Sequence, residues 1–170
     1  MLSEKQIDPL VELAFNNSPE FLRWFISKTN YKGLNGSCVW SRSNHPWGRL
    51  TFNLKDPETD QYREMTRDSE TDVLVVLEED SGKRFAFHIE NKLADGHFTL
   101  FQPDMYKQRA EAWLRNEKFG NYSEFETILL SPLAFYKRNR EEAEKFDRYI
   151  SYEEASIYIP ELADNCQWPI

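Results

Sequence analysis

Two short apolar segments separated by turn-forming residues dominate the pattern of hydrophobic and polar positions along the chain. Residues 71–77 and 84–89 are rich in Val, Leu, Ile and Phe, and residues 80–82 between them read Asp-Ser-Gly. Apolar runs of this length on either side of such a turn are typical of a β-hairpin. A hairpin that folds symmetrically about its turn places Asp72 opposite Glu90.

Polar residues gather at the open end of this predicted hairpin. Opposed side chains on one face of an antiparallel pair lie about 5 Å apart at Cβ, and side chains alternate between the two faces of a strand. Lys92 therefore shares a face with Asp72 and Glu90, whereas Asn91 points to the other face. Two carboxylates beside an apolar run favour a bound cation between them. The alternative is a solvated strand end with an exposed Glu-x-Lys ion pair of little energetic value.

Two helices are predicted before the hairpin. Ser3 and Gln6 form a capping-box pattern, and apolar residues then recur at helical spacing as far as Phe15. Ser18 followed by Pro19 has the residue types that begin a second helix.

The segment between these helices and the hairpin is predicted to be irregular except for two strands. Residues 32–47 contain several glycine, proline and polar residues, which indicates a loop around a short strand at 38–40. Residues 48–54 alternate between apolar and polar, and we interpret them as the first strand of the main sheet. Residues 55–69 are charged and turn-forming, and we expect them to form a loop.

Several polar and aromatic residues in and around these segments allow two interpretations. His45 and Trp47 are either packed loop residues or residues of a surface near a substrate. Arg63 and Arg67 either contact a phosphate backbone or pair with neighbouring carboxylates. His88 is either a core histidine or a residue that supports Glu90.

The second half of the chain continues an α/β pattern. Pro103 begins a predicted helix that runs to about residue 118 and stops at Gly120. Residues 125–130 form a strand that such a helical crossover makes parallel to residues 84–89. One helix face carries four residues at helical spacing, namely Gln102, Tyr106, Arg109 and Trp113.

The C-terminal third adds helices of mixed charge. The basic run 137–140 is followed at once by glutamates, so we interpret it as a helical ion-pair surface. Residues 151–158 indicate a short capped helix. The whole chain, 1–170, is therefore predicted to form one α/β domain with a mixed central β-sheet and flanking helices.

Composition restricts the functional class. The chain has 170 residues, 12 Phe, 8 Tyr and 5 Trp, and a net charge of −8. This charge does not attract nucleic acid over the whole surface, so nucleic-acid binding requires a local basic surface, a metal or a partner. Cys38 and Cys166 lack the spacing of a zinc site or a disulfide framework. No secretion signal or membrane-spanning stretch is evident, and we expect a cytoplasmic protein without membrane association.

One stretch resembles a known enzyme family. Asp72, the strand end Ile89-Glu90-Asn91-Lys92 and the following Gln102-x-x-x-Tyr106 pattern are similar to the PD-(D/E)XK nuclease superfamily, in particular to bacterial members with an "IENK" strand end. The specific match covers about residues 70–113. The chain departs from the family's pattern at Thr71, where the family's name has a proline.

The resemblance implies a fold, a cofactor and a reaction. The fold is the restriction-endonuclease-like three-layer sandwich. Mg²⁺ or Mn²⁺ would be held by Asp72, Glu90 and the backbone carbonyl of Asn91, and the family's helix acid would correspond to Glu12. Oxygen ligands suit these ions and not zinc.

Three further residues complete the catalytic assignment that the resemblance implies. Lys92 would orient the attacking water and offset charge in the transition state, and Gln102 and Tyr106 would support the site from the helix. The implied activity is metal-dependent hydrolysis of phosphodiester bonds in DNA.

A second hypothesis remains beside the nuclease. A protein of the same fold without activity would serve as a scaffold, using its acidic surface to bind protein partners; the net charge of −8 favours this reading. The sequence leaves open whether the chain forms a homodimer. Other hydrolase classes rank lower, because the chain contains no G-x-S-x-G, H-E-x-x-H or P-loop motif.

Overall fold

The architecture combines a five-stranded mixed sheet, a separate two-stranded sheet and flanking helices. We describe residues 1–167 of a computed structural model. The strands of the main sheet occur in the order β1-β4-β5-β6-β7. Their bounds are β1 Gly36–Arg42, β4 Val73–Glu79, β5 Arg84–Asn91, β6 Glu124–Ser131 and β7 Arg148–Ser151.

The predicted hairpin forms the centre of this sheet with the expected register. β4 and β5 are antiparallel, and their pairs run from Val73 opposite Ile89 to Glu78 opposite Arg84. β6 is parallel to β5, as predicted, and β7 is parallel to β6. β1 is antiparallel to β4 and is longer than the predicted strand at 38–40.

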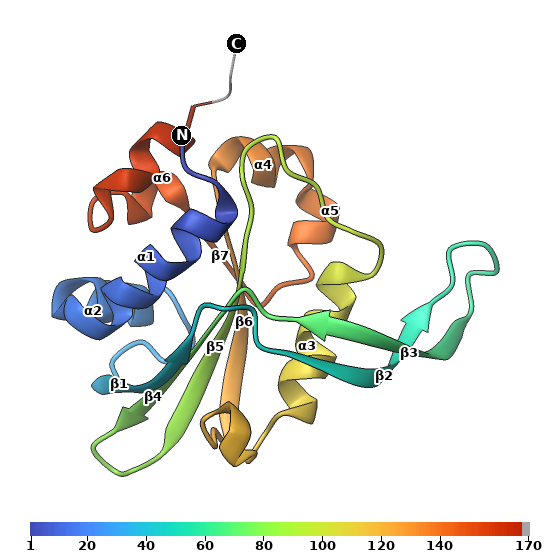
Figure 1. The fold of residues 1–170 in the computed structure, drawn as a ribbon, viewed down its shortest axis with the longest axis horizontal. Coiled ribbons are helices and arrows are strands. Elements are labelled where there is room, and N and C mark those ends of the chain that lie inside the picture. The colour runs from blue at the N-terminus through green and yellow to red at the C-terminus, as the bar shows by residue number, and fades with distance from the viewer. Residues whose placement is uncertain (168–170) are drawn as a thin grey trace.

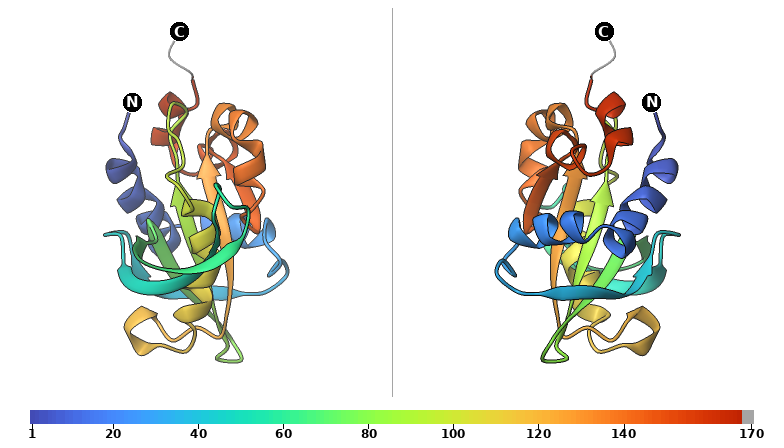
Figure 2. Two further views of the ribbon diagram at one scale, coloured as in Figure 1. Left: turned by 90° about the vertical axis from the view of Figure 1, so that its right-hand side faces the viewer. Right: turned by 90° about the vertical axis from the view of Figure 1, so that its left-hand side faces the viewer.

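Helices cover both faces of the sheet (Figures 1 and 2). The residues Phe85, Phe87 and Ile89 of β5 face a core formed with α1 (Glu4–Asn17) and α2 (Pro19–Ser27). Figure 1 shows these two helices on one side of the strands and α3 (Gln102–Ala112) on the other. Ala86 lies in the core on the α3 side. Because both faces of β5 are covered, every residue from Phe85 to Asn91 is buried.

Both predicted N-terminal helices are present with the predicted starts. Ser3 and Gln6 form the capping box of α1, and the Ser18 side chain accepts a hydrogen bond at the start of α2. The shorter helices of the C-terminal third are α4 (Leu133–Arg138), α5 (Arg140–Ala143) and α6 (Tyr152–Ala155), with the 3₁₀ helix η2 (Pro160–Asn165). Every helix among residues 1–167 is too short or too polar to cross a lipid bilayer.

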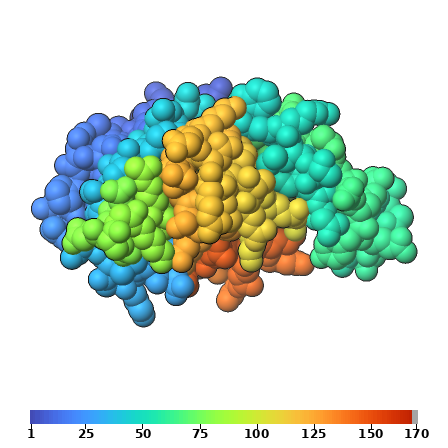
Figure 3. Space-filling model, turned by 90° about the horizontal axis from the view of Figure 1, so that it is seen from below, coloured from blue at the N-terminus to red at the C-terminus, as the bar shows by residue number. Residues whose placement is uncertain are grey.

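The segment before the hairpin forms an arm instead of a loop. β2 (Trp47–Lys55) pairs with β3 (Tyr62–Glu70) in an antiparallel ribbon that is separate from the main sheet. The prediction of residues 48–54 as the first strand of the main sheet is therefore wrong, and so is the prediction of a loop over 55–69. Leu50, Phe52 and Leu54 alternate as predicted, but they pack with Phe101 and Met105. The arm projects from the body (Figures 1 and 3).

The helix that follows the hairpin is shorter than predicted. α3 ends at Ala112, and a 3₁₀ helix, η1 (Glu117–Phe119), follows it before Gly120. The Trp113 and Phe119 rings stack at 3.8 Å between centroids with an angle of 8° between their planes. This stacking requires the chain to reverse after Trp113, which ends the helix early.

Gly120 is the position where the backbone requires glycine most strictly. Its φ is +84°, and an added Cβ would lie 2.6 Å from Val76 Cγ2. Gly120→Ala is expected to lower the free energy of unfolding by about 2–4 kcal/mol, from the left-handed conformation and the overlap together. Gly82→Ala is the matched control, because Gly82 has a φ of +86° and no atom within 4 Å of its added Cβ. Both free energies of unfolding are measured by urea denaturation. If the two variants lose equal amounts, the overlap with Val76 does not contribute to the destabilisation.

Candidate metal centre

The two strands of the central hairpin bring two buried carboxylates into one cavity. Asp72 directly precedes β4, and Glu90 is the penultimate residue of β5. Asp72 is 6% exposed and Glu90 is 1% exposed. Both line a cavity of about 650 Å³ that also contains Lys92 and Gln102. We call it the acidic cavity.

Glu90 is held by three of the residues that the sequence singled out. Lys92 Nζ lies 2.9 Å from Glu90 Oε1. Gln102 Nε2 donates to the same oxygen at 2.6 Å, and the Tyr106 hydroxyl donates to Oε2. Gln102 and Tyr106 lie one turn apart on α3, so the helix presents both to the carboxylate. These contacts fix the orientation of Glu90.

Asp72 is linked to the same network through backbone groups. Its backbone N–H donates to the Tyr106 hydroxyl at 3.2 Å, and its Oδ2 accepts from the backbone N–H of Asn91 at 2.9 Å. Burial raises the pKa of Asp72 well above its ordinary value, and the carboxylates of Glu90 and Asp8 raise it further. A cation in the cavity would relieve this repulsion.

Asn91 points to the opposite face of the sheet, as the alternation predicts. Its side-chain amide donates to Asp8 Oδ1 at 2.9 Å, and it accepts from the Tyr152 hydroxyl. Asp8 is fully buried on α1. The sequence analysis missed Asp8, although its spacing of three and seven residues from Val11 and Phe15 places an acid on the buried face of the helix.

His45, which the sequence allowed either in a packed loop or near a substrate, was not predicted to contact the candidate metal ligands. Its Nε2 lies 2.8 Å from Asp8 Oδ2, and its Nδ1 lies 3.0 Å from Glu70 Oε1 and 3.6 Å from Asp72 Oδ1. The hydrogen bond to Asp8 raises the pKa of His45 to about 10, burial opposes the shift, and Glu70 and Asp72 add to it. The imidazolium therefore lies as a cation among three carboxylates. The structure places it in the acidic cavity, and Trp47 is 61% exposed instead of packed.

The donor atoms of the acidic cavity fit a divalent cation. Ligand atoms of His45, Glu70 and Asp72 lie within 4.8 Å of one another. Glu90 adds a carboxylate at the same cavity. Carboxylate oxygens are the donors preferred by Mg²⁺ and Mn²⁺, whereas the protonated His45 would have to lose a proton before a ring nitrogen could bind a metal.

Glu12, the helix acid that the family resemblance implies as a metal ligand, lies away from the donor atoms of the acidic cavity. Its Oε1 accepts a hydrogen bond from Ser43 Oγ at 2.7 Å, and Glu12 does not line the acidic cavity. Glu4 of the same helix does line it and accepts a hydrogen bond from the backbone N–H of Leu93. Burial raises the pKa of Glu4. Among the described residues, Glu4 and Asp8 are the acids that α1 directs to this site.

The remaining candidates have structural contacts. His88 is fully buried, its ring nitrogens bonded to Thr71 Oγ1 and the Tyr122 hydroxyl, so it is a core histidine. Arg63 pairs with Asp56 at 3.2 Å. The guanidinium of Arg67 lies 5.1 Å from the centre of the Phe101 ring. In the basic run, Arg140 pairs with Glu144 in the expected helical arrangement. Cys38 and Cys166 are free.

The protonation of His45 predicts a pH-dependent stability. Its pKa is about 10 in the fold against 6.5 ordinarily, so its stabilising contribution is complete below pH 6.5 and is lost as pH rises towards 10. The slope that His45 adds for the metal-free protein is at most about 1.4 kcal/mol per pH unit. His45→Asn is expected to make the free energy of unfolding, measured by urea denaturation, depend less on pH between pH 6.5 and pH 10. The exposed His97→Asn is the control, and an unchanged slope in His45→Asn would contradict the assignment.

Comparison with known proteins identifies no relative of the chain. The chain matches no protein-family model, and neither the curated proteins nor the solved structures contain a significant match.

Proposed function

We propose that the protein is a Mg²⁺- or Mn²⁺-dependent nuclease that hydrolyses phosphodiester bonds of DNA, with the restriction-endonuclease-like fold. The observation that carries the proposal is that buried Asp72 and Glu90 line one cavity, with Lys92 bonded to Glu90. A buried acid pair of this kind, flanked by a lysine, is suited to a divalent ion and an anionic substrate.

The residues of the acidic cavity and of α3 have distinct roles in this proposal. Asp72, Glu90 and the Asn91 carbonyl would hold the ion, which when bound polarises a phosphodiester oxygen and makes water more acidic. The Glu90 carboxylate, against the effect of burial, raises the pKa of Lys92. Lys92 is therefore a cation that donates hydrogen bonds, and it would orient the attacking water and offset the negative charge of the transition state. Gln102 and Tyr106 would keep Glu90 in position.

A cleavage assay with matched variants tests the proposal. Purified protein is incubated with linear, circular and single-stranded DNA in Mg²⁺, in Mn²⁺ and in EDTA. We expect metal-dependent cleavage that Glu90→Gln and Lys92→Met each lower about 100-fold or more. Glu78→Gln and Lys83→Met are controls on the same hairpin. Glu78 pairs with Arg84 and Lys83 pairs with Glu124, and both ion pairs lie at the surface. Cleavage that persists in EDTA, or that both site variants retain, would contradict the proposal.

The net charge of −8 supports one alternative, an inactive scaffold that binds protein partners. The two functions differ in their response to metal. If the folded protein binds Mg²⁺ or Mn²⁺, adding the ion raises the melting temperature of the protein. A melting temperature that neither ion changes, together with no heat of metal binding, would favour the scaffold.

A further inference from the structure

A second cavity lies directly beside the acidic cavity. It has a volume of about 500 Å³, and its walls include Trp47, Ser69 and Arg109. We call it the arginine cavity. Glu70 and Gln102 line both cavities, so the two are neighbours that share a wall.

Arg109 is a buried cation with unused hydrogen-bonding capacity. The residue is 1% exposed, its Nε donates to Thr71 Oγ1 at 2.9 Å, and its guanidinium lies 4.2 Å from the centre of the Tyr106 ring. Its Nη2 has no hydrogen-bond partner among residues 1–167. A buried donor without a partner costs roughly 1–3 kcal/mol, and more when the group is charged.

Ser69 gives a second, independent indication of a ligand at the same place. Its Oγ is also buried without a hydrogen-bond partner in the described chain, and Ser69 lines the same cavity. The two acids on the wall already have cationic neighbours, because Asp68 pairs with Arg49 at 3.1 Å and Glu70 with His45 at 3.0 Å. A guanidinium nitrogen and a hydroxyl that both lack an acceptor are suited to an oxyanion such as a phosphate.

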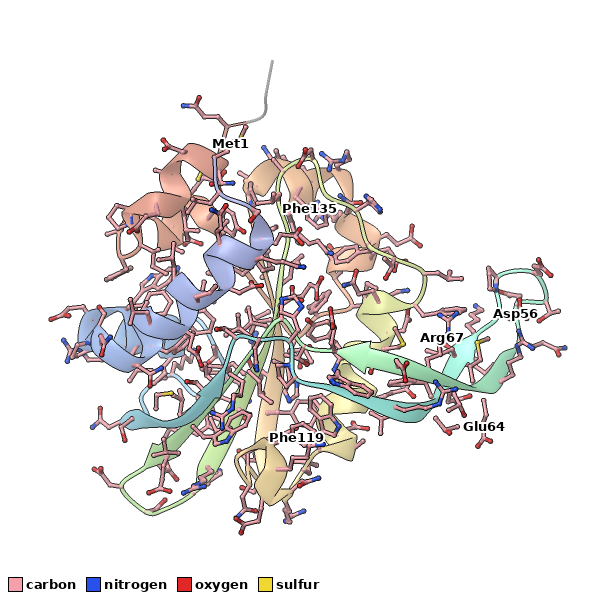
Figure 4. All side chains as sticks on the ribbon, in the orientation of Figure 1. Met1, Asp56, Glu64, Arg67, Phe119 and Phe135 are labelled. Atoms are coloured by element: carbon pink, nitrogen blue, oxygen red, sulfur yellow. The ribbon has the colours of Figure 1, made fainter. Side chains whose placement is uncertain are left out.

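Trp47 adds an aromatic surface to this cavity. The side chain is 61% exposed at the start of β2 of the arm. An adjoining cavity of about 520 Å³ continues along the arm past Arg67, and the two share Asp68, Thr99 and Met105. Figure 4 shows Arg67 and Glu64 on opposite sides of the arm. The positive side chain thus belongs to the side that carries the cavities.

We infer that the arginine cavity binds an unpaired nucleotide of a single-stranded DNA segment next to the bond that is cut. Arg109 and Ser69 take its phosphate, and Trp47 stacks on its base. The inference rests on the proposed nuclease function and names the form of its substrate. A base inside a duplex is already stacked on its neighbours and cannot reach the indole ring without leaving the helix.

Binding without metal separates this inference from catalysis. The probe is a fluorescein-labelled single strand of twelve thymidines, measured by fluorescence anisotropy in EDTA and 50 mM salt, beside a duplex of the same length. We expect the single strand to bind more tightly than the duplex. Trp47→Ala is expected to weaken single-strand binding about fivefold or more, while Trp47→Phe retains most of it.

Two further variants complete the design. Arg109→Lys keeps the charge but loses the paired donors, and we expect it to weaken binding of the single strand. Tyr62→Ala is the matched control, because Tyr62 is 67% exposed on the same arm but does not line the arginine cavity. Because Trp47 is exposed, its variants stay informative even if Arg109→Lys fails to fold.

The outcomes are distinguishable from those of the cleavage assay. Absence of single-strand binding, tighter binding of the duplex, or equal binding by wild type and Trp47→Ala would overturn the inference, even if the protein cleaves DNA. Binding that depends on Trp47, without metal-dependent cleavage, would support the nucleotide site and overturn the nuclease proposal.

Discussion

Asp72→Asn is expected to abolish the proposed metal-dependent cleavage and, at the same time, to stabilise the metal-free protein. Loss of cleavage should exceed about 100-fold, because even residues that only orient a metal ligand typically contribute 10–100-fold. The gain in stability follows from the burial and the neighbouring acids that raise the pKa of Asp72. The Asp72 carboxyl group is buried beside Glu90, and asparagine cannot ionise there while it keeps an oxygen for the backbone N–H of Asn91.

The sign of the stability effect can be checked by pH. A carboxyl group with a raised pKa stabilises the fold below its ordinary pKa and loses this contribution as pH rises through the folded value. The gain from Asp72→Asn, of the order of 1–3 kcal/mol at neutral pH, should therefore shrink as pH falls. Urea denaturation in EDTA measures it, with Asp80→Asn at the exposed turn of the same hairpin as control. If metal-free Asp72→Asn is less stable than the metal-free wild type at pH 7, the repulsion assigned between Asp72 and its neighbouring acids is contradicted.

Phe87→Ala is expected to lower the free energy of unfolding by about 3–5 kcal/mol, which is a large share of the stability of a domain. Phe87 is fully buried, and its ring centre lies 5.2 Å from that of Phe25 and 6.4 Å from that of Phe15. Truncation leaves a cavity between β5 and the helices α1 and α2, which cannot close because rings surround it. Urea denaturation followed by circular dichroism measures the change.

The control for this substitution is Ile157→Ala. Ile157 is 77% exposed, so its loss should change the free energy of unfolding by less than about 0.5 kcal/mol. A loss below about 1 kcal/mol in Phe87→Ala would show that the core between α1, α2 and the sheet is not tightly packed.

The central hairpin could be predicted because its pattern is local and dense. The register of β4 and β5 follows from the turn and from the apolar positions, so the approach of Asp72 and Glu90 required no knowledge of the rest of the chain. The helix starts at Ser3 and Ser18 were predictable for the same reason, since capping depends on residues within one turn.

The arm could not be predicted, because its second strand carries no apolar alternation. β3 reads Tyr-Arg-Glu-Met-Thr-Arg-Asp-Ser-Glu and is mostly exposed. Its stability comes from pairing with β2, including Arg49 opposite Asp68 and Thr51 opposite Thr66. Cross-strand pairs of charged and hydroxyl side chains do not show in a hydrophobic pattern.

The part of the site that was missed is brought together by tertiary structure. His45 lies between the main sheet and the arm, and Asp8 lies on α1, far from β5 in the sequence. No local spacing relates these residues to Asp72. The same holds for Arg109, whose missing partner becomes evident only when its surroundings are known.

The hydrogen bond from the Asn91 backbone N–H to the Asp72 carboxylate has a practical consequence for spectroscopy. The chemical shift of a backbone proton bonded to a carboxylate changes when that carboxylate gains a proton or binds a cation. Binding of the proposed Mg²⁺ ion to Asp72 should therefore move the Asn91 cross-peak in a ¹⁵N-correlated NMR spectrum before any DNA is added. A single assigned resonance would then report occupancy of the centre in solution, independently of whether the protein cuts anything.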